Sequence, residues 1–215
     1  MSSVIWHVTM SLDGFIAGRD DSMDWVVAQW SDGGETTRDI DVQRSAVADA
    51  VLQGAGAILG GRRWYDVAVR EFGYEGIYGG QWSGPVFVLT HRSPGADHHP
   101  AITFLSGDLS DAVATATGAA AGKNVIVFGA NLAAQCLRAG LLDEIVIHLA
   151  PVLLGGGVRL IDAPDLGPVA LERTLVATSG QITDLRFAVR RKGQPDRQAV
   201  AGPLRAVHPV PRLPA

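Results

Sequence analysis

Short segments made almost wholly of apolar residues most constrain how this chain can fold. Residues 57–60, 86–89, 102–105 and 124–128 each have the length of one strand, and glycine or proline stands close to each of them. A strand without a polar face must be covered on both sides, as in parallel sheets flanked by helices. The segments therefore predict an α/β protein.

Helical and hairpin patterns complete the expected order of elements. Residues 36–53 carry apolar side chains at helical spacing, an alanine-rich helix follows Ser110, and another helix begins near Leu132. Residues 170–179 and 182–190 have the pattern of an antiparallel hairpin. We therefore expect a three-layer αβα fold whose central mixed, mostly parallel sheet ends in a C-terminal antiparallel hairpin.

The chain is interpreted as one domain followed by a tail. With 215 residues and 47% hydrophobic composition it can bury one large core, which we assign to residues 1–191. Residues 192–215 are rich in proline and charge and cannot bury much surface. They are expected to form a Pro-rich C-terminal tail.

Charge and cysteine content exclude several kinds of partner. The net charge of -4 gives no field that would attract nucleic acid or an anionic membrane. The single Cys136 excludes an intramolecular disulfide and a multi-thiolate metal site, and it is interpreted as a small buried apolar residue. No segment reaches the roughly 18 apolar residues that span a membrane, and the N-terminus lacks a signal-peptide pattern. We therefore expect a cytoplasmic protein without bound metal.

The junction after residue 128 is the most informative binding signal. Gly129, Ala130 and Asn131 connect a predicted strand to the helix that begins near Leu132. Free backbone N–H groups and the positive end of the helix dipole make such a junction an anion site that a cofactor pyrophosphate would fit. The alternative is that Gly129 only tightens a strand-to-helix turn.

Three common signatures are missing from the sequence. It contains no G-x-G-x-x-G and no G-x-x-x-x-G-K-[ST], which argues against an ordinary Rossmann domain and a P-loop enzyme. It also lacks H-x-E with P-C-x-x-C, so the chain has no ligands for a zinc deaminase site.

Arginines follow two of the predicted strands. Gly61 and Arg62 come after one strand, and Thr90 and Arg92 come after the next. Ligands of open α/β sheets bind at the carboxyl ends of the strands, where arginine forks suit a 2′-phosphate. The alternative is that both arginines are solvated side chains of a helix start and a polar loop.

Asp13 is the candidate catalytic residue. It lies in a Ser-Leu-Asp-Gly turn at the end of the first predicted strand. A carboxylate there can bind a polar group of a substrate or assist proton transfer. It can also simply cap the turn.

Several segments together resemble one family. They are MSLDGFIAG from Met10, ILGGRRWYD from Ile58, VFVLT from Val86, and a long block that begins at Val125 and contains LGGG at 154–157. In order and spacing they resemble the riboflavin-biosynthesis reductases (RibD C-terminal) within the dihydrofolate-reductase-like superfamily. The resemblance covers residues 4–190, and the last block is its most specific part.

The resemblance implies an NADPH-dependent reductase and assigns its site. It places Ala17 and Gly18 near the nicotinamide, Gly61, Arg62, Thr90 and Arg92 at the adenosine end, and Gly129, Ala130, Asn131 and Leu132 at the pyrophosphate. Asp13 matches the family's S-x-D-G pattern. The family usually has a second glycine in place of Ala130, whose methyl group requires an ordinary φ. Residues 26–31 lack the carboxylate of true dihydrofolate reductases, which argues against folate reduction.

The substrate is expected to be a small nitrogen heterocycle. The named candidate is 5-amino-6-(5-phosphoribosylamino)uracil, and a pterin or a secondary metabolite is the alternative. A non-catalytic nucleotide-binding protein of the same fold also stays open. The family implies a homodimer, and the aromatic, glycine-rich residues 72–82 are expected to form a loop near the pocket mouth.

Overall fold

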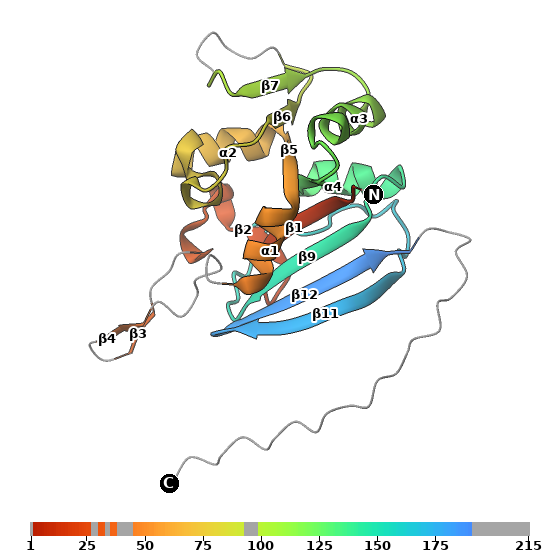
Figure 1. Ribbon diagram of the computed structural model, residues 1–215. Coiled ribbons are helices and arrows are strands. Elements are labelled where there is room, and N and C mark those ends of the chain that lie inside the picture. The colour runs from red at the N-terminus through yellow and green to blue at the C-terminus, as the bar shows by residue number, and fades with distance from the viewer. Residues whose placement is uncertain (1, 27–29, 33–34, 38–44, 93–98, 191–215) are drawn as a thin grey trace.

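The computed structural model describes most of the chain (Figure 1). The described residues are 2–26, 30–32, 35–37, 45–92 and 99–190. The predicted tail at 192–215 lies outside them.

An eight-stranded sheet forms the centre of the molecule. In spatial order its strands are β11 (Leu171–Ser179), β12 (Ile182–Val189), β9 (Glu144–Ala150), β1 (Val4–Ser11), β8 (Asn124–Phe128), β5 (Ala55–Gly61), β6 (Val86–Leu89) and β7 (Ile102–Leu105). The strands from β9 to β7 run parallel, whereas β12 pairs antiparallel with both β9 and β11. Figure 1 shows β7 and the β11–β12 hairpin at opposite edges of this sheet. The predicted mixed sheet with a closing antiparallel hairpin is confirmed.

Helices cover both faces of the sheet. Residues of α1 (Ala46–Gly54), α2 (Arg62–Phe72) and the 3-10 segment η4 (Tyr74–Gly80) pack on one face. Residues of α3 (Leu109–Ala119) and α4 (Ala130–Arg138) pack on the other. The three-layer αβα prediction is confirmed. None of the helices in the described ranges is long and apolar enough to cross a membrane.

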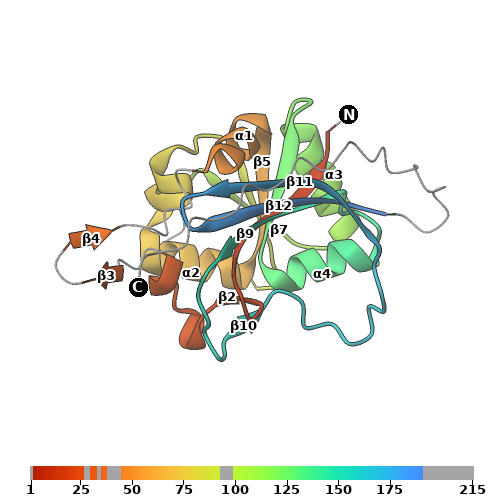
Figure 2. The same ribbon diagram turned by 90° about the horizontal axis from the view of Figure 1, so that it is seen from below.

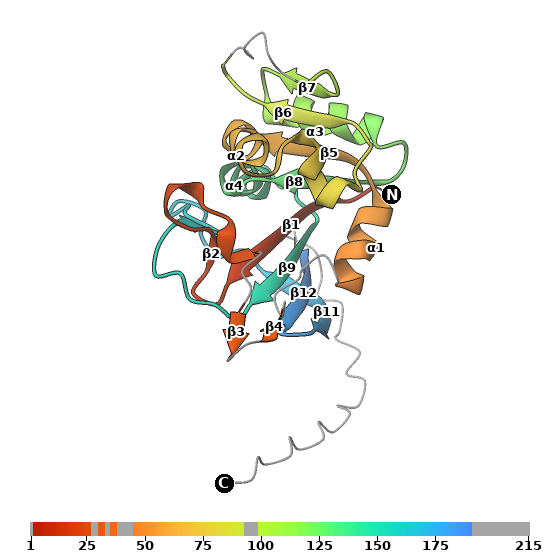
Figure 3. The same ribbon diagram turned by 90° about the vertical axis from the view of Figure 1, so that its left-hand side faces the viewer.

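The carboxyl ends of the central strands lead directly into helices. Figure 3 shows β5 and β8 running toward α2 and α4 on one side of the molecule, where β2 (Phe15–Ala17) also lies, with α1 on the other side. β2 pairs antiparallel with β10 (Val158–Arg159). The short 3-10 turns η1 (Arg19–Asp21) and η2 (Asp24–Val26) follow β2. This side of the sheet therefore gathers loops from distant parts of the sequence.

The predicted helix over residues 36–53 is wrong at its start. Residues Glu35–Thr37 form strand β4, which pairs with β3 (Trp30–Asp32) in a ribbon that Figure 2 shows set apart from the sheet. The helix begins at Ala46, because the Ser45 hydroxyl accepts hydrogen bonds from the backbone N–H groups of Val47 and Ala48. A serine N-cap of this kind fixes a helix start more strongly than apolar spacing does.

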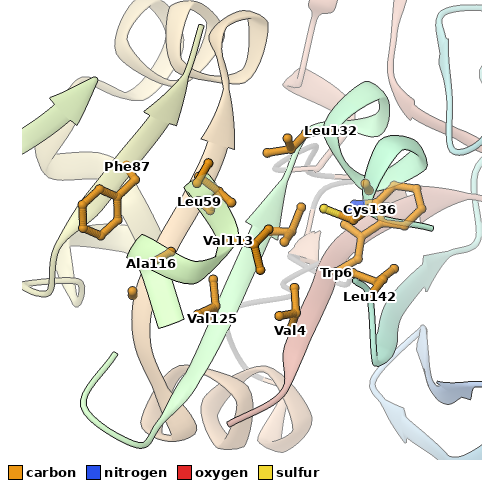
Figure 4. Close-up of a cluster of buried hydrophobic side chains, with 14 of the residues drawn as sticks. Val4, Trp6, Leu59, Phe87, Val113, Ala116, Val125, Leu132, Cys136 and Leu142 are labelled. Atoms are coloured by element: carbon orange, nitrogen blue, oxygen red, sulfur yellow. The ribbon is translucent and has the colours of Figure 1, made fainter. Parts of the chain in front are cut away.

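The larger apolar cluster lies under α3 and α4 (Figure 4). Trp6, Cys136 and Leu142 lie together in it, and their side chains are almost fully buried. Burial raises the pKa of the Cys136 thiol to about 12. The interpretation of Cys136 as a small apolar core residue is confirmed.

Candidate functional site

A cavity of about 1750 Å³ lies at the carboxyl ends of the parallel strands. All of the predicted cofactor-binding residues line it, and we call this set the rim: Ala17, Gly18, Gly61, Arg62, Thr90, Arg92, Gly129, Ala130, Asn131 and Leu132. The structure thus brings together residues that the sequence places on four separate loops. Their binding of a cofactor stays a prediction.

The junction at Gly129 has the geometry expected of an anion site. Gly129 is the N-cap of α4 with φ 99° and ψ 128°, a conformation that favours glycine, and the first turn of α4 carries no acidic side chain. A Cβ on Gly129 would lie 3.6 Å from the Cβ of Trp64. Ala130 opens the helix and is absent from the described non-glycine residues with positive φ, so its methyl group meets the condition set by the sequence.

The two predicted arginines have different surroundings. The Nε of Arg62 donates to Asp66 across 2.7 Å, and its guanidinium carbon lies 5.9 Å from the ring centre of Tyr65. Arg92 is exposed, and its backbone N–H donates to the Thr90 hydroxyl across 3.1 Å. The ion pair between Arg62 and Asp66 is exposed and therefore weak. Arg62 could thus bind a phosphate at this end of the cavity while it stays in contact with Asp66.

The glycine run of the LGGG block shapes the loop that carries Ala17 and Gly18. A Cβ on Gly157 would lie 2.1 Å from the Ala17 carbonyl oxygen and 2.9 Å from the Gly18 Cα, and φ there is 132°. Only glycine allows so close an approach of two backbones. Gly157, which belongs to the most specific segment of the resemblance, therefore helps to position Ala17 and Gly18, the two rim residues predicted to lie near the nicotinamide.

Asp13 lies outside the residues that line the cavity. Its carboxylate accepts hydrogen bonds from the Ser11 hydroxyl at 2.7 Å and from the backbone N–H groups of Leu154 and Gly155. The Ser11 bond, together with these backbone bonds, lowers the pKa of Asp13 to about 2. These contacts are those of the turn-capping alternative, with the carboxylate fixing the start of the glycine run. A catalytic role for Asp13 stays a prediction.

A second set of cavity residues went unnoticed in the sequence. Tyr78, His7 and His148 line the cavity, and Asp184 lies behind them. The Tyr78 hydroxyl lies 2.6 Å from His7 Nδ1, His7 Nε2 lies 2.5 Å from His148 Nε2, and His148 Nδ1 lies 2.5 Å from Asp184 Oδ1. We call these four residues the floor.

Strand pairing explains why the floor residues meet. His148 on β9 is paired in register with Thr9 on β1 and with Asp184 on β12. His7 precedes Thr9 by two positions, and side chains two positions apart share a face of the sheet. The polar positions within apolar strands were visible in the sequence, but the order of the strands was needed to bring them together.

Two serine hydroxyls donate hydrogen bonds to the buried Asp184 of the floor. Asp184 Oδ2 accepts hydrogen bonds from Ser45 Oγ at 2.8 Å and from Ser179 Oγ at 2.9 Å. Ser45 is also the N-cap of α1, so the positive end of that helix faces the carboxylate. The fully buried Asp184 therefore has hydrogen bonds from three side chains.

Burial dominates the protonation of the floor. It lowers the pKa of His7, and the neighbouring His148 lowers it further. Burial also lowers the pKa of His148, although hydrogen bonding and the charge of Asp184 oppose the shift. Burial raises the pKa of Tyr78 well above its usual range. At neutral pH the resting floor thus holds a neutral tyrosine and two neutral imidazoles.

Together, the mostly parallel αβα sheet and the cavity across its strand ends define an α/β protein with a candidate ligand site at the carboxyl ends of its strands. The chain belongs to the RibD C-terminal domain family, whose model matches residues 2–183. It is therefore a member of a family of oxidoreductases of the riboflavin-biosynthesis type. Among the rim and floor residues, Asp184 alone falls just beyond the matched segment.

Solved structures share this fold at low sequence identity. A protein from Shewanella sp. PV-4 assigned to riboflavin biosynthesis has 21% identity, covers 89% of this chain and 100% of its own, and gives a TM-score of 0.70. A pyrimidine reductase-like protein from Corynebacterium diphtheriae has 13% identity, with 88% and 92% coverage and a TM-score of 0.56.

A bifunctional enzyme is also similar in fold. It is the diaminohydroxyphosphoribosylaminopyrimidine deaminase/5-amino-6-(5-phosphoribosylamino)uracil reductase of Thermotoga maritima, with 14% identity and a TM-score of 0.58. The match covers 88% of this chain but only 57% of the Thermotoga protein. No curated protein matches this chain.

Proposed function

We propose that this chain is an NADPH-dependent reductase of a nitrogen heterocycle, resembling 5-amino-6-(5-phosphoribosylamino)uracil reductase. The convergence of the rim residues on one cavity is the observation that supports this most strongly. The family membership and the fold of the reductase neighbours agree with it. A cytoplasmic location and a homodimer belong to the same proposal.

The rim residues fit a phosphorylated dinucleotide. Gly129 leaves room at the N-terminus of α4 for a pyrophosphate to approach the backbone N–H groups of the first turn. Arg62 and Arg92 would hold the 2′-phosphate, and Ala17 and Gly18 would face the nicotinamide. When bound, NADPH supplies the hydride, and the protein supplies orientation and exclusion of water.

Binding of the two nicotinamide cofactors tests the proposal. We expect tight NADPH binding and weaker NADH binding. Quenching of tryptophan emission and enhancement of nicotinamide emission measure both. The double variant Arg62→Ala, Arg92→Ala should weaken NADPH about tenfold or more and NADH much less, because only NADPH carries the 2′-phosphate. Arg173→Ala on the exposed strand β11 is the matched control for loss of charge.

Two outcomes would contradict the proposal. Equal losses for NADPH and NADH in the double variant would remove the 2′-phosphate assignment. No binding of either cofactor to the wild-type protein would favour the non-catalytic reading of this fold. With cofactor binding established, consumption of NADPH in the presence of pyrimidine, pterin and other heterocyclic substrates identifies the substrate class.

A further inference from the structure

The floor is a continuous chain of hydrogen bonds from the cavity to the buried side of β12. It begins at Tyr78, which is half-buried, and ends at Asp184, which is fully buried. Between them lie His7 and His148, whose side chains are 5% and 1% exposed. Two buried imidazoles in direct contact are costly to fold unless every nitrogen has a partner, as here.

Asp184, at the buried end of the chain, fixes the direction of every hydrogen bond of the floor in the resting state. Asp184 as a carboxylate can only accept, so His148 Nδ1–H donates to it and leaves a lone pair on His148 Nε2. His7 Nε2–H must then donate to that lone pair, which leaves His7 Nδ1 as the acceptor for the Tyr78 hydroxyl. The Tyr78 proton is therefore engaged with His7 when the floor is neutral.

One added proton reverses the middle of the chain. If His148 carries protons on both nitrogens, its Nε2–H donates to His7 Nε2, and His7 Nδ1–H donates to the Tyr78 oxygen. The Tyr78 hydroxyl proton is then released from His7, and because Tyr78 lines the cavity, this proton becomes available to a ligand there. The added positive charge lies beside Asp184, whose carboxylate also accepts hydrogen bonds from the Ser45 and Ser179 hydroxyls.

The backbone at Tyr78 independently indicates a constrained position. Tyr78 has φ 52° and ψ 37°, a left-handed conformation that a bulky residue adopts only at a cost. Gly79 and Gly80 follow, also with positive φ. The surrounding structure therefore holds the Tyr78 ring stacked on His7, with ring centres 5.6 Å apart and planes at 17°.

We propose that Tyr78 is the proton donor of the reduction and that His7, His148 and Asp184 form the relay that loads it. This inference rests on the proposed function. The carbon of the substrate double bond gains the hydride, and the electron pair of that bond passes to its nitrogen or oxygen. That atom takes the Tyr78 hydroxyl proton, Tyr78 regains one from His7 Nδ1–H, and His7 Nε2 takes the Nε2 proton of His148. A proton from water in the cavity re-enters at Tyr78 and passes back through His7 to His148 Nε2, while His148 Nδ1–H continues to donate to Asp184.

Nitrogen NMR of the imidazoles tests the relay without any substrate or cofactor. We expect His148 to carry its proton on Nδ1 and His7 on Nε2 at neutral pH, and the pair to take up a single shared proton as the pH is lowered. Tyr78→Phe should shift the His7 Nδ1 signal, whereas Tyr65→Phe, a tyrosine outside the cavity, should not. Independent titration of the two histidines would overturn the relay.

The pH profile of turnover tests proton delivery. We expect kcat to fall as the pH rises, because the donor state requires one bound proton. The titratable groups along the path are Tyr78 on η4, His7 on β1, His148 on β9 and Asp184 on β12. Further along β9 and β12, Glu144 and Arg186 pair with each other at 2.5 Å and add no net charge.

Tyr78→Phe separates proton donation from binding. The variant should lower kcat about 10²- to 10⁴-fold, with the Kd for NADPH nearly unchanged and the pH dependence lost. Asp184→Asn should move the fall of kcat to lower pH, since the anion beside His148 is gone. Tyr65→Phe should keep wild-type kinetics. Wild-type turnover in Tyr78→Phe would overturn the donor assignment.

Failure of the relay and failure of the proposed function give different results. A wild-type protein that binds NADPH and reduces a heterocycle, but whose Tyr78→Phe variant does so equally well, keeps the function and loses the relay. A wild-type protein that reduces no heterocycle and binds no cofactor loses the function, and the NMR titration then decides the coupling of the two histidines by itself.

Discussion

The rim and the floor of the cavity are built in contrasting ways. Rim residues stand close to each other in sequence where strands end and helices begin, so Gly129, Ala130 and Asn131 form one local signal. Three of the four floor residues come from within strands: His7 and His148 are 141 positions apart, and His148 and Asp184 are 36 apart. The fourth, Tyr78, lies on η4. The rim therefore depends on backbone conformation, whereas the floor depends on sheet register.

Removal of Asp184 should give the largest loss of stability. Asp184→Ala leaves His148 Nδ1–H and the hydroxyls of Ser45 and Ser179 without their common buried acceptor, at a cost of about 3–5 kcal/mol. Chemical denaturation measures the change. Asp165→Ala, which removes an exposed partner of Arg138, should change stability little. Equal losses of stability in the two variants would mean that the floor contributes no more to folding than a surface ion pair does.

Replacement of Gly129 should affect binding more than folding. Alanine at φ 99° is strained by about 1–3 kcal/mol, and relief of that strain would move the first turn of α4. NADPH binding should weaken by about tenfold or more. Gly118→Ala in α3, where a Cβ meets nothing within 4 Å, is the control and should leave binding intact. Unchanged binding in Gly129→Ala would contradict the pyrophosphate assignment.

Acid should lower the free energy of unfolding through the two histidines of the floor. Burial lowers the pKa of His7 and His148, so below about pH 6.5 the unfolded chain binds more protons than the folded one, and stability falls with pH. The slope should be at most about 1.4 kcal/mol per pH unit for each histidine. Unfolding curves between pH 7.5 and 5.5 measure it. His7→Gln should flatten the slope, and an unchanged slope would assign it elsewhere.

Asp13→Asn should have the smallest effect. The substitution keeps an acceptor for the N–H groups of Leu154 and Gly155 but removes the negative charge. That charge is what the hydrogen bonds from Ser11 and from these N–H groups stabilise, which lowers the pKa of Asp13 to about 2. The charge stabilises the turn above the ordinary carboxyl pKa, and this contribution disappears as pH falls toward 2. We expect a slightly lower thermal midpoint and turnover close to wild type. A large loss of kcat at unchanged stability would instead establish Asp13 as catalytic.

Much of the fold could be predicted because its signals are local. The apolar run at Val86–Leu89 and the glycine junction after Asn124–Phe128 have few alternatives to buried strands with a turn. The apolar spacing upstream of Ser45 resembles that of a helix, so the sequence pattern predicts the start of α1 too early. There the serine N-cap, which is also a local signal, decided the boundary.

The floor could not be predicted because its chemistry appears only after pairing. A histidine inside an apolar strand reads as a single buried polar residue, and Tyr78 reads as part of a glycine-rich loop. The register between β1 and β9 and between β9 and β12 turns these separate positions into one hydrogen-bonded chain. These registers join strands that lie far apart in the sequence, and the local patterns of a single sequence do not reveal which strands become neighbours.

The position of Asp184 on the last hairpin also sets the order in which the site is completed during synthesis. Every rim residue precedes the end of α4 at Arg138, whereas the floor needs β12 to pair with β9. The ribosome synthesises the chain from its N-terminus, so β12 becomes available to pair with β9 only near the end of synthesis. A product truncated before β12 would thus keep the loops proposed to bind the dinucleotide but lack Asp184, the last residue of the proposed proton relay.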